Sequence, residues 1–210
     1  MTMPVICDKY DLYFTHVPKA GGSFVERFLR QQMDGRRVGP RHATYRWCPS
    51  ERPVTYRVFV VREPVSWYKS YWAYARAATK PSAWPIWEAG DKRHPTHRLD
   101  LTGGAPTFER FVRKVLREFP NGYVRAMYCD FLNGSTHALR TERLYDDFEW
   151  LLGAVGFENP GVIRKWPRAN ETPTQFSEQA VLPIELEDEL REVDNLEGLL
   201  FPFVPSEPPG

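Results

Sequence analysis

The chain has 210 residues, with 28 Lys and Arg against 27 Asp and Glu, so its formal net charge is +1. This balance excludes binding to nucleic acid through overall charge, because such binding needs a strong basic excess. Domains usually have about 100 to 200 residues, so we expect a single domain over residues 1–210. Hydrophobic residues make up 42% and charged residues 26%, as in globular proteins, which excludes a wholly disordered chain.

The cysteines and the N-terminal residues bear on the compartment. Cys7, Cys48 and Cys129 have neither the even number of a disulfide framework nor the spacing of a zinc site, which favours a reducing compartment. Residues 1–10 lack a basic segment followed by an apolar one, and no stretch reaches the roughly 18 apolar residues of a spanning helix. We therefore expect a cytoplasmic protein without a transmembrane segment.

The first structured region runs from Asp11 to Gln32. An apolar run at 12–17 (LYFTHV) predicts a strand, and the glycine pair at 21–22 predicts a tight turn. Apolar residues then recur at helical spacing. They are Phe24, Val25, Phe28 and Leu29. We therefore expect a strand, a loop and a helix in this order.

The second region repeats this order. The apolar run at 56–61 (YRVFVV) predicts a strand buried on both faces, and Pro64 suits the first turn of a helix that continues to about Ala78. Strands buried on both faces are typical of a parallel sheet that helices cover. The sequence therefore predicts an α/β fold, a single domain with a central parallel sheet flanked by helices.

The remaining chain is mainly helical after an insertion. Residues 79–106 are rich in proline and glycine and predict a long irregular insertion. Further elements are expected as helices at about 107–119, 145–155 and 183–200, a strand at 138–144 and a loose Pro-rich tail at about 202–210.

A lysine and two glycines stand between the first strand and its helix, in the segment PKAGGS at 18–23. Such a turn exposes backbone N–H groups beside the positive end of the helix dipole, which favours an anion. Lys19 precedes Gly21 and Gly22, whereas the lysine of a Walker A loop follows its glycines. Taken alone, the segment is as consistent with a purely structural glycine turn that carries a solvated lysine as with an anion-binding loop.

A second candidate site lies where the second strand ends. Arg62 follows that strand, and Ser70 comes eight residues later within the next helix. Open α/β sheets bind ligands at the carboxyl ends of their strands, and the planar guanidinium of Arg suits a phosphate. Taken singly, Arg62 as a strand-end ion pair and Ser70 as a surface serine are the simpler interpretations.

Together, the two segments resemble the sulfotransferase family that uses 3′-phosphoadenosine 5′-phosphosulfate. PKAGGS at 18–23 is similar to the family's P-K-x-G-[GST]-[ST] loop, and VVREPVSWYKS at 60–70 is similar to its later 3′-phosphate segment. The sequence HVPKAGGS at 16–23 is more similar to the carbohydrate-type branch of the family than to the small-phenol branch. Residues 139–157 resemble the family's late strand and helix more weakly. The insertion at 79–106 has no counterpart that we can match in the family. Because the family's acceptor specificity lies in such variable regions, the insertion bears on the identity of the acceptor.

The resemblance implies a P-loop-like phosphosulfate-binding loop and a reaction that needs no metal. Lys19 would assist departure of the product, 3′-phosphoadenosine 5′-phosphate, and Arg62 with Ser70 would bind the 3′-phosphate. The acceptor would be a small molecule or a carbohydrate hydroxyl. The implied donor-binding residues are Lys19, Ala20, Gly21, Gly22, Ser23, Phe24, Arg62 and Ser70.

Sulfuryl transfer to a hydroxyl also needs a base. His42 lies 20 residues before Arg62, in the segment where members of the family commonly carry a catalytic histidine. A neutral imidazole, with a usual pKa near 6.5, can take a proton at pH 7. Glu26 stays open as a second candidate, because some members use a glutamate. His16 is expected to pack against the loop or to hydrogen-bond it.

The insertion could supply an acceptor surface. Its Trp84, Trp87, His94 and His97 suit a sugar ring, and Arg76, Lys80, Lys92, Arg93 and Arg98 make the region basic. A solvated basic loop is an equally consistent interpretation. The helical spacing of another aromatic group predicts core residues. These are Trp67, Tyr68, Tyr71, Trp72 and Tyr74.

Two other functions stay open. A P-loop phosphotransferase shares the strand, the anion loop and the parallel sheet, but the Gly-Lys-Ser/Thr order and a Walker B strand are missing here. A non-catalytic nucleotide-binding protein on the same fold is the other alternative. The sequence carries no prediction of oligomeric state.

Overall fold

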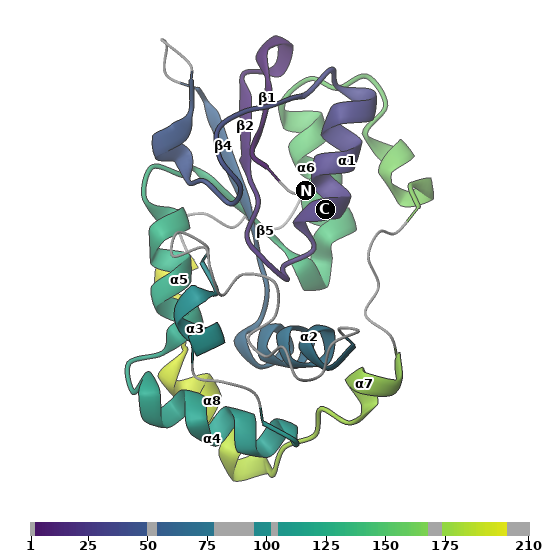
Figure 1. Cartoon of the computed structure of the whole chain (residues 1–210). Helices are drawn as coiled ribbons and strands as arrows, with labels where there is room; N and C mark the ends of the chain where they lie inside the picture. Colours follow the sequence, from purple (N-terminus) through teal and green to yellow (C-terminus); the bar gives the residue numbers. More distant parts are fainter. Residues whose placement is uncertain (1–2, 50–53, 78–94, 102–104, 168–173, 201–210) are drawn as a thin grey trace. The chain divides into compact units, whose positions relative to one another are not determined.

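A computed structural model of the chain describes residues 3–49, 54–77, 95–101, 105–167 and 174–200 (Figure 1). The chain divides into two compact units. Unit 1 comprises Met1–Arg62, Cys129–Asn170 and Glu197–Gly210, and unit 2 comprises Glu63–Tyr128 and Glu171–Leu196. The single domain expected over the whole chain stays a prediction. None of the described helices is long and apolar enough to cross a membrane.

Unit 1 is built on a five-stranded sheet with the strand order β3-β1-β2-β4-β5. Three neighbouring strands pair in parallel, namely β2 (Leu12–Thr15), β4 (Tyr56–Val61) and β5 (His137–Arg140). The other two pairs are antiparallel and involve β1 (Val5–Cys7) with β2, and β1 with β3 (Arg36–Arg37). The α/β class is therefore confirmed, but the sheet is mixed and not wholly parallel.

The short connection between β1 and β2 explains the mixed sheet. Only the 3-10 turn η1 (Asp8–Tyr10) and Asp11 join the two strands. A parallel pair needs a crossover of about a dozen residues or more, so a link of this length forces an antiparallel pair. β1 was not predicted, because the first expected region begins at Asp11.

Two helices of unit 1 pack against each other through aromatic rings. They are α1 (Gly22–Gln32) and α6 (Leu144–Ala154), which lie side by side in Figure 1. The Phe24 ring meets those of Tyr145 and Phe148, with centroids 5.4 and 6.4 Å away. Phe28 meets Phe148 at 5.2 Å. The apolar helix face expected in this region is therefore confirmed as buried core.

Residues 38–49, which follow β3, contribute to a second cluster on the sheet. Ile6 and Tyr13 form a buried cluster with Val38 and Val54, and Tyr45 packs against this cluster. Side chains of successive strand residues point to opposite faces, so Ile6 lies on the face opposite Val5 and Cys7. Residues 38–49 contain the 3-10 turn η2 (Tyr45–Trp47) and His42. Val38 and Tyr45 hold this part of the chain against the sheet.

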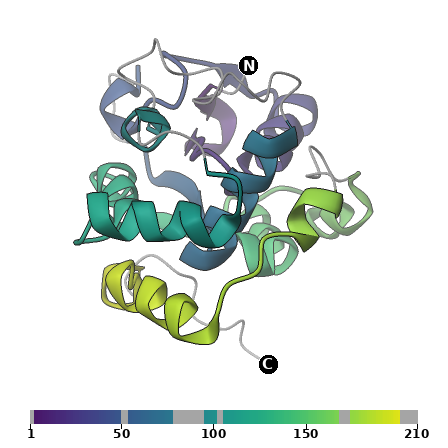
Figure 2. The same cartoon turned by 60° about the horizontal axis from the view of Figure 1, so that its bottom comes forward.

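Unit 2 is helical. Its helices are α2 (Pro64–Ala77), α3 (His97–Leu101), α4 (Phe108–Glu118), the first part of α5 (Tyr123–Leu132), α7 (Thr174–Glu178) and α8 (Ile184–Val193). Helix α2 packs with α4, α7 and α8, and Figure 2 shows α4 beside α8. Asp194 is fully buried after α8, where it accepts hydrogen bonds from the Tyr68 hydroxyl and the Arg125 N–H, each at 2.8 Å.

Aromatic side chains of α2 form the core of unit 2. Trp67 stacks on Tyr71 at 5.4 Å, and Tyr71 stacks on Phe111 of α4 at 5.8 Å. Trp72 meets Phe108, with 5.7 Å between centroids. The expectation of an aromatic core is confirmed for Trp67, Tyr68, Tyr71 and Trp72. It is wrong for Tyr74, which is exposed because it lies on the outer side of α2.

Several expected boundaries change. The helices expected at 107–119 and 145–155 are confirmed as α4 and α6, but the one expected at 183–200 ends at Val193, and α9 (Glu197–Leu200) follows separately. The burial of Asp194 interrupts it. The strand expected at 138–144 ends at Arg140, because the next residues form the 3-10 turn η3 (Thr141–Arg143). Unit 1 also contains the 3-10 helix η4 (Pro160–Lys165).

The insertion is not irregular throughout. Helix α3 (His97–Leu101) lies within the range 79–106, where the sequence analysis expected no helix. The tail expected at 202–210 lies outside the described residues.

Candidate anion-binding site

The loop between β2 and α1 has a strained backbone. Lys19 has φ +61° and Gly21 has φ +81°, so both lie in the left-handed region. Gly21 adopts this conformation without penalty, whereas a lysine pays about 1 to 2 kcal/mol. Helix α1 then begins at Gly22, and the Phe24 N–H donates to the Gly21 carbonyl at 3.0 Å. Strain of this kind is concentrated at functional sites, where the surroundings hold it in place.

Two cations meet at this loop. Arg62 directly follows β4, the parallel neighbour of β2, and its Nη1 donates to the Lys19 carbonyl at 3.2 Å. Burial, and to a smaller extent the nearby charge of Arg62, lower the pKa of the Lys19 ammonium to about 8. An anion bound between the two groups would offset both effects, because an opposite charge favours the protonated form. The pair is therefore suited to a phosphate or sulfate ligand.

Thr141, the first residue after the parallel strand β5, contacts both segments. Its Oγ1 lies 2.8 Å from the Ala20 carbonyl oxygen and 2.9 Å from that of Val61. It thus links the loop to the end of β4. Thr141 was not predicted, although a hydroxyl residue directly after a strand of an α/β sheet, where ligands bind, is a usable signal.

His42 is held against the first residue of the same loop. Its ring is buried, and Nδ1 lies 2.7 Å from the His16 carbonyl oxygen. Because a carbonyl can only accept, Nδ1 carries the hydrogen in the neutral ring, and Nε2 is then the nitrogen that accepts a proton. The backbone of His42 is also left-handed, with φ +51°. A histidine in this tautomer has the form that a general base requires.

The ring of His16 packs between His42 and the start of α1. The two imidazole centroids are 5.2 Å apart. A Cβ atom placed on Gly22 would lie 2.7 Å from Nδ1 of His16, closer than real Cβ atoms approach. Gly22 therefore makes room for the His16 ring. This placement agrees with the interpretation of His16 as a residue that packs against the loop.

Glu26 has a different environment from His42. It is buried one turn into α1, and Oε1 accepts a hydrogen bond from Nε of Arg37 in β3 at 2.7 Å. The same oxygen lies 2.7 Å from Nη2 of Arg37. Glu26 therefore ties α1 to the strand at the edge of the sheet. Its candidacy as a base stays a prediction.

The other expected donor residues are placed as follows. Ala20 and Phe24 are buried, and Ser23 is half-buried at the start of α1. Ser70 is buried in α2, within unit 2. The roles of these residues in binding stay predictions.

The expected acceptor residues are only partly described. Lys80, Trp84, Trp87, Lys92, Arg93 and His94 lie outside the described residues. His97 begins α3, and the Arg98 guanidinium lies 5.2 Å from the centroid of the Phe119 ring. Among the residues that the structure describes, no cluster of three or more His, Cys, Asp or Glu side chains could hold a metal ion.

Compared with known proteins, the chain matches no protein-family model, no curated protein and no solved structure. The likeness to sulfotransferases therefore rests on the two sequence segments, at 18–23 and 60–70. The physical case for a site rests on Lys19, Arg62 and His42.

Proposed function

We propose that the protein is a sulfotransferase that moves a sulfuryl group from 3′-phosphoadenosine 5′-phosphosulfate to an acceptor hydroxyl of a carbohydrate or glycolipid. The observation that carries the proposal is the placement of Lys19 beside Arg62 at the ends of β2 and β4. An anion bound beside both groups would offset the burial and the charge of Arg62 that lower the pKa of Lys19. The segments that supply them are the two that resemble the family's donor-binding motifs.

The loop between β2 and α1 would bind the phosphosulfate. Backbone N–H groups at the start of α1 form the positive end of the helix dipole, where an anion is favoured. Lys19 would stabilise the charge that develops on the leaving phosphate. Arg62 would bind the 3′-phosphate, and Ser70 retains the role that the sequence motif predicts for it.

His42 would accept the acceptor's proton. In the reaction, the acceptor oxygen forms a bond to sulfur while the bond between sulfur and the bridging oxygen of the donor breaks. The hydroxyl proton passes to Nε2 of His42, and 3′-phosphoadenosine 5′-phosphate leaves with the electron pair of the broken bond. The His16 carbonyl, which holds Nδ1–H, would stabilise the imidazolium that forms.

The test is transfer of labelled sulfate from 3′-phosphoadenosine 5′-phosphosulfate to a panel of sugars, glycolipids and phenols. We expect label on a carbohydrate or glycolipid, without added metal, and loss of transfer in Lys19→Met. Transfer of phosphate from ATP and magnesium, with no sulfate transfer, would instead support the phosphotransferase alternative. Binding of 3′-phosphoadenosine 5′-phosphate without transfer to any acceptor would support a non-catalytic protein.

A further inference from the structure

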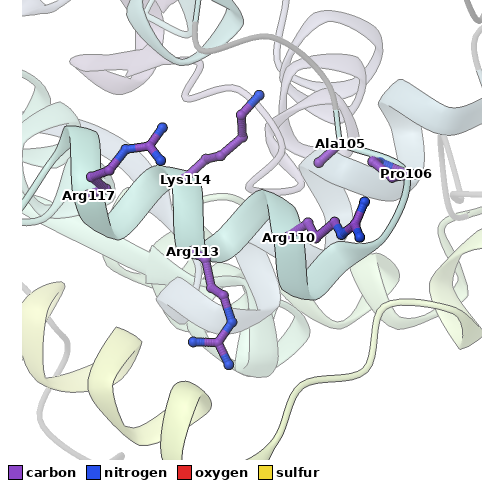
Figure 3. A pocket seen from close by; sticks show the side chains of 6 residues that line it. All are labelled: Ala105, Pro106, Arg110, Arg113, Lys114 and Arg117. Carbon is purple, nitrogen blue, oxygen red and sulfur yellow. The ribbon is translucent and has the colours of Figure 1, made fainter.

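Helix α4 carries a basic surface within unit 2. Arg110, Arg113, Lys114 and Arg117 line a cavity of about 360 Å³, together with Ala105 and Pro106 (Figure 3). Sites for small ligands usually have volumes of ~300–1,000 Å³. The cavity lies within unit 2 and involves none of the residues assigned to the donor site.

The spacing of these side chains places like charges beside one another. Residues three and four apart are neighbours on a helix, so Arg110 lies next to Lys114, and Lys114 lies next to Arg117. Like charges at these spacings repel each other and destabilise a helix slightly. An anion bound across the group would remove this repulsion. The ends of Arg110, Lys114 and Arg117 lie along one side of α4, and Arg113 extends from the other (Figure 3).

The glutamates on α4 neutralise these charges only weakly, because their ion pairs are exposed to solvent. Arg113 pairs with Glu109 at 2.9 Å, and Arg117 pairs with Glu118 at 3.2 Å. All four side chains are exposed. Exposed ion pairs contribute little to stability, so a ligand anion can replace them at little cost.

The wall of the cavity is held in place by the core of unit 2. Phe108, Phe111 and Val115 are buried on the inner side of α4. The Thr107 hydroxyl caps the helix by accepting from the Arg110 N–H at 3.3 Å. The carbonyl of Ala105 accepts from the Trp72 indole N–H at 3.4 Å. The basic side chains therefore project from a rigid base, which lowers the entropy lost on binding.

We infer that this cavity binds a compact soluble polyanion, a ligand with at least two sulfate or phosphate groups. Arg guanidinium groups donate two parallel hydrogen bonds to such groups. The inference goes beyond the proposed function, since it concerns a second anion site whose occupancy needs no sulfuryl transfer.

Two other polyanionic partners fit less well. A helix that binds a membrane surface exposes its apolar side to the lipid, whereas the apolar side of α4 is buried in the core. Binding of single-stranded nucleic acid uses aromatic side chains on which bases stack. None of the described residues that line the cavity is aromatic.

The experiment measures binding of sucrose octasulfate and of inositol hexakisphosphate to the full chain by calorimetry. It compares wild type with the triple variant Arg110→Gln, Lys114→Gln, Arg117→Gln. The matched control removes three exposed charges elsewhere, in Arg30→Gln, Arg125→Gln, Lys165→Gln. We expect at least one probe to bind about tenfold or more weakly to the triple variant, and the control to bind nearly as wild type.

Further measurements distinguish loss of the proposed site from unfolding and from binding elsewhere. Glutamine retains helix propensity, so the triple variant should unfold no earlier than wild type, and each single variant should show part of the loss. Lys19→Met should bind the probe as wild type does, which separates this site from the donor site. Equal losses in both triple variants, or no binding of either probe, would overturn the inference. Tighter binding to anionic vesicles or to a single-stranded oligonucleotide, lost in the same triple variant, would also overturn it.

Discussion

Arg62 reaches from the end of β4 to the carbonyl of Lys19, at 3.2 Å from Nη1 to oxygen. The contact joins the two segments that resemble sulfotransferase motifs, although 43 positions separate them in the chain. The charge of this guanidinium is the second cause, after burial, of the lowered pKa of the Lys19 ammonium. An anion bound beside both groups would favour the protonated form of Lys19.

Binding of 3′-phosphoadenosine 5′-phosphate is expected to weaken above pH 8. Lys19, with a pKa of about 8, loses its charge as the pH rises through that value, and the attraction for the anion falls. Calorimetry on either side of pH 8 measures this change. Lys19→Arg is the control, because its guanidinium stays charged and its affinity should lack the step. A step of equal size in Lys19→Arg would show that another group titrates.

The same pKa has the opposite effect on the stability of the protein without ligand. Its value in the folded chain, about 8, lies below the usual 10.5, so the unfolded chain binds the proton more tightly between these two values. The free energy of unfolding should therefore rise as the pH increases from about 8 toward 10.5. Denaturant titrations of wild type and Lys19→Met measure this rise, which should be smaller in the variant. Identical pH profiles would contradict the burial of a charged Lys19.

His42→Asn should abolish transfer and retain the fold. The amide N–H₂ of asparagine can still donate to the His16 carbonyl, but no nitrogen remains that can take a proton. General-base catalysis contributes about 10²- to 10⁴-fold, so the turnover number should fall by that factor. The thermal shift with 3′-phosphoadenosine 5′-phosphate should persist. Near-normal turnover would refute His42 as the base.

Glu26 can be separated from His42 through its partner. If the carboxylate acts only by pairing with Arg37, then Glu26→Gln and Arg37→Gln should change turnover alike. Arg37→Gln should be the less stable variant, by about 1 to 3 kcal/mol, because it leaves a buried carboxylate without its charged partner. The double variant should add nothing for turnover. Loss of turnover in Glu26→Gln alone would identify Glu26 as the base.

Gly22→Ala should destabilise the loop. The added methyl group would lie 2.7 Å from Nδ1 of the buried His16 ring, so ring or helix must move, at about 1 to 3 kcal/mol. Gly153→Ala in α6 is the matched control, since nothing lies within 4 Å of its Cβ position, and it should stabilise by about 0.5 to 1 kcal/mol. Urea unfolding measures both. Equal stability of the two variants would contradict the contact between Gly22 and His16.

The parts of the fold that the sequence predicted best depend on local patterns. The run at 56–61 and Pro64 correctly placed β4 and the start of α2, because a continuous apolar run and a proline are local signals. The antiparallel β1 was not predicted, since its three residues carry too little pattern. The end of β5 at Arg140 depends on Thr141, whose partners are carbonyls 80 and more positions away.

In the candidate site too, some features are visible in the sequence and others depend on contacts between distant residues. Lys19 and Arg62 were proposed from motif and strand position, which are visible in sequence. The tautomer of His42 and the packing of His16 over Gly22 depend on contacts between distant residues, so no sequence pattern could show them. Glu26 was open as a base in sequence, and only the position of Arg37 in β3 reveals its ion pair.

The central claim is that Lys19 and Arg62 bind a 3′-phosphorylated adenine nucleotide. The most direct measurement is the thermal unfolding of wild type and Lys19→Met with 3′-phosphoadenosine 5′-phosphate, compared with ATP and magnesium. The account predicts a rise in the unfolding temperature of wild type with the first ligand only, and a much smaller rise in the variant. A rise with ATP and magnesium and none with 3′-phosphoadenosine 5′-phosphate would contradict it.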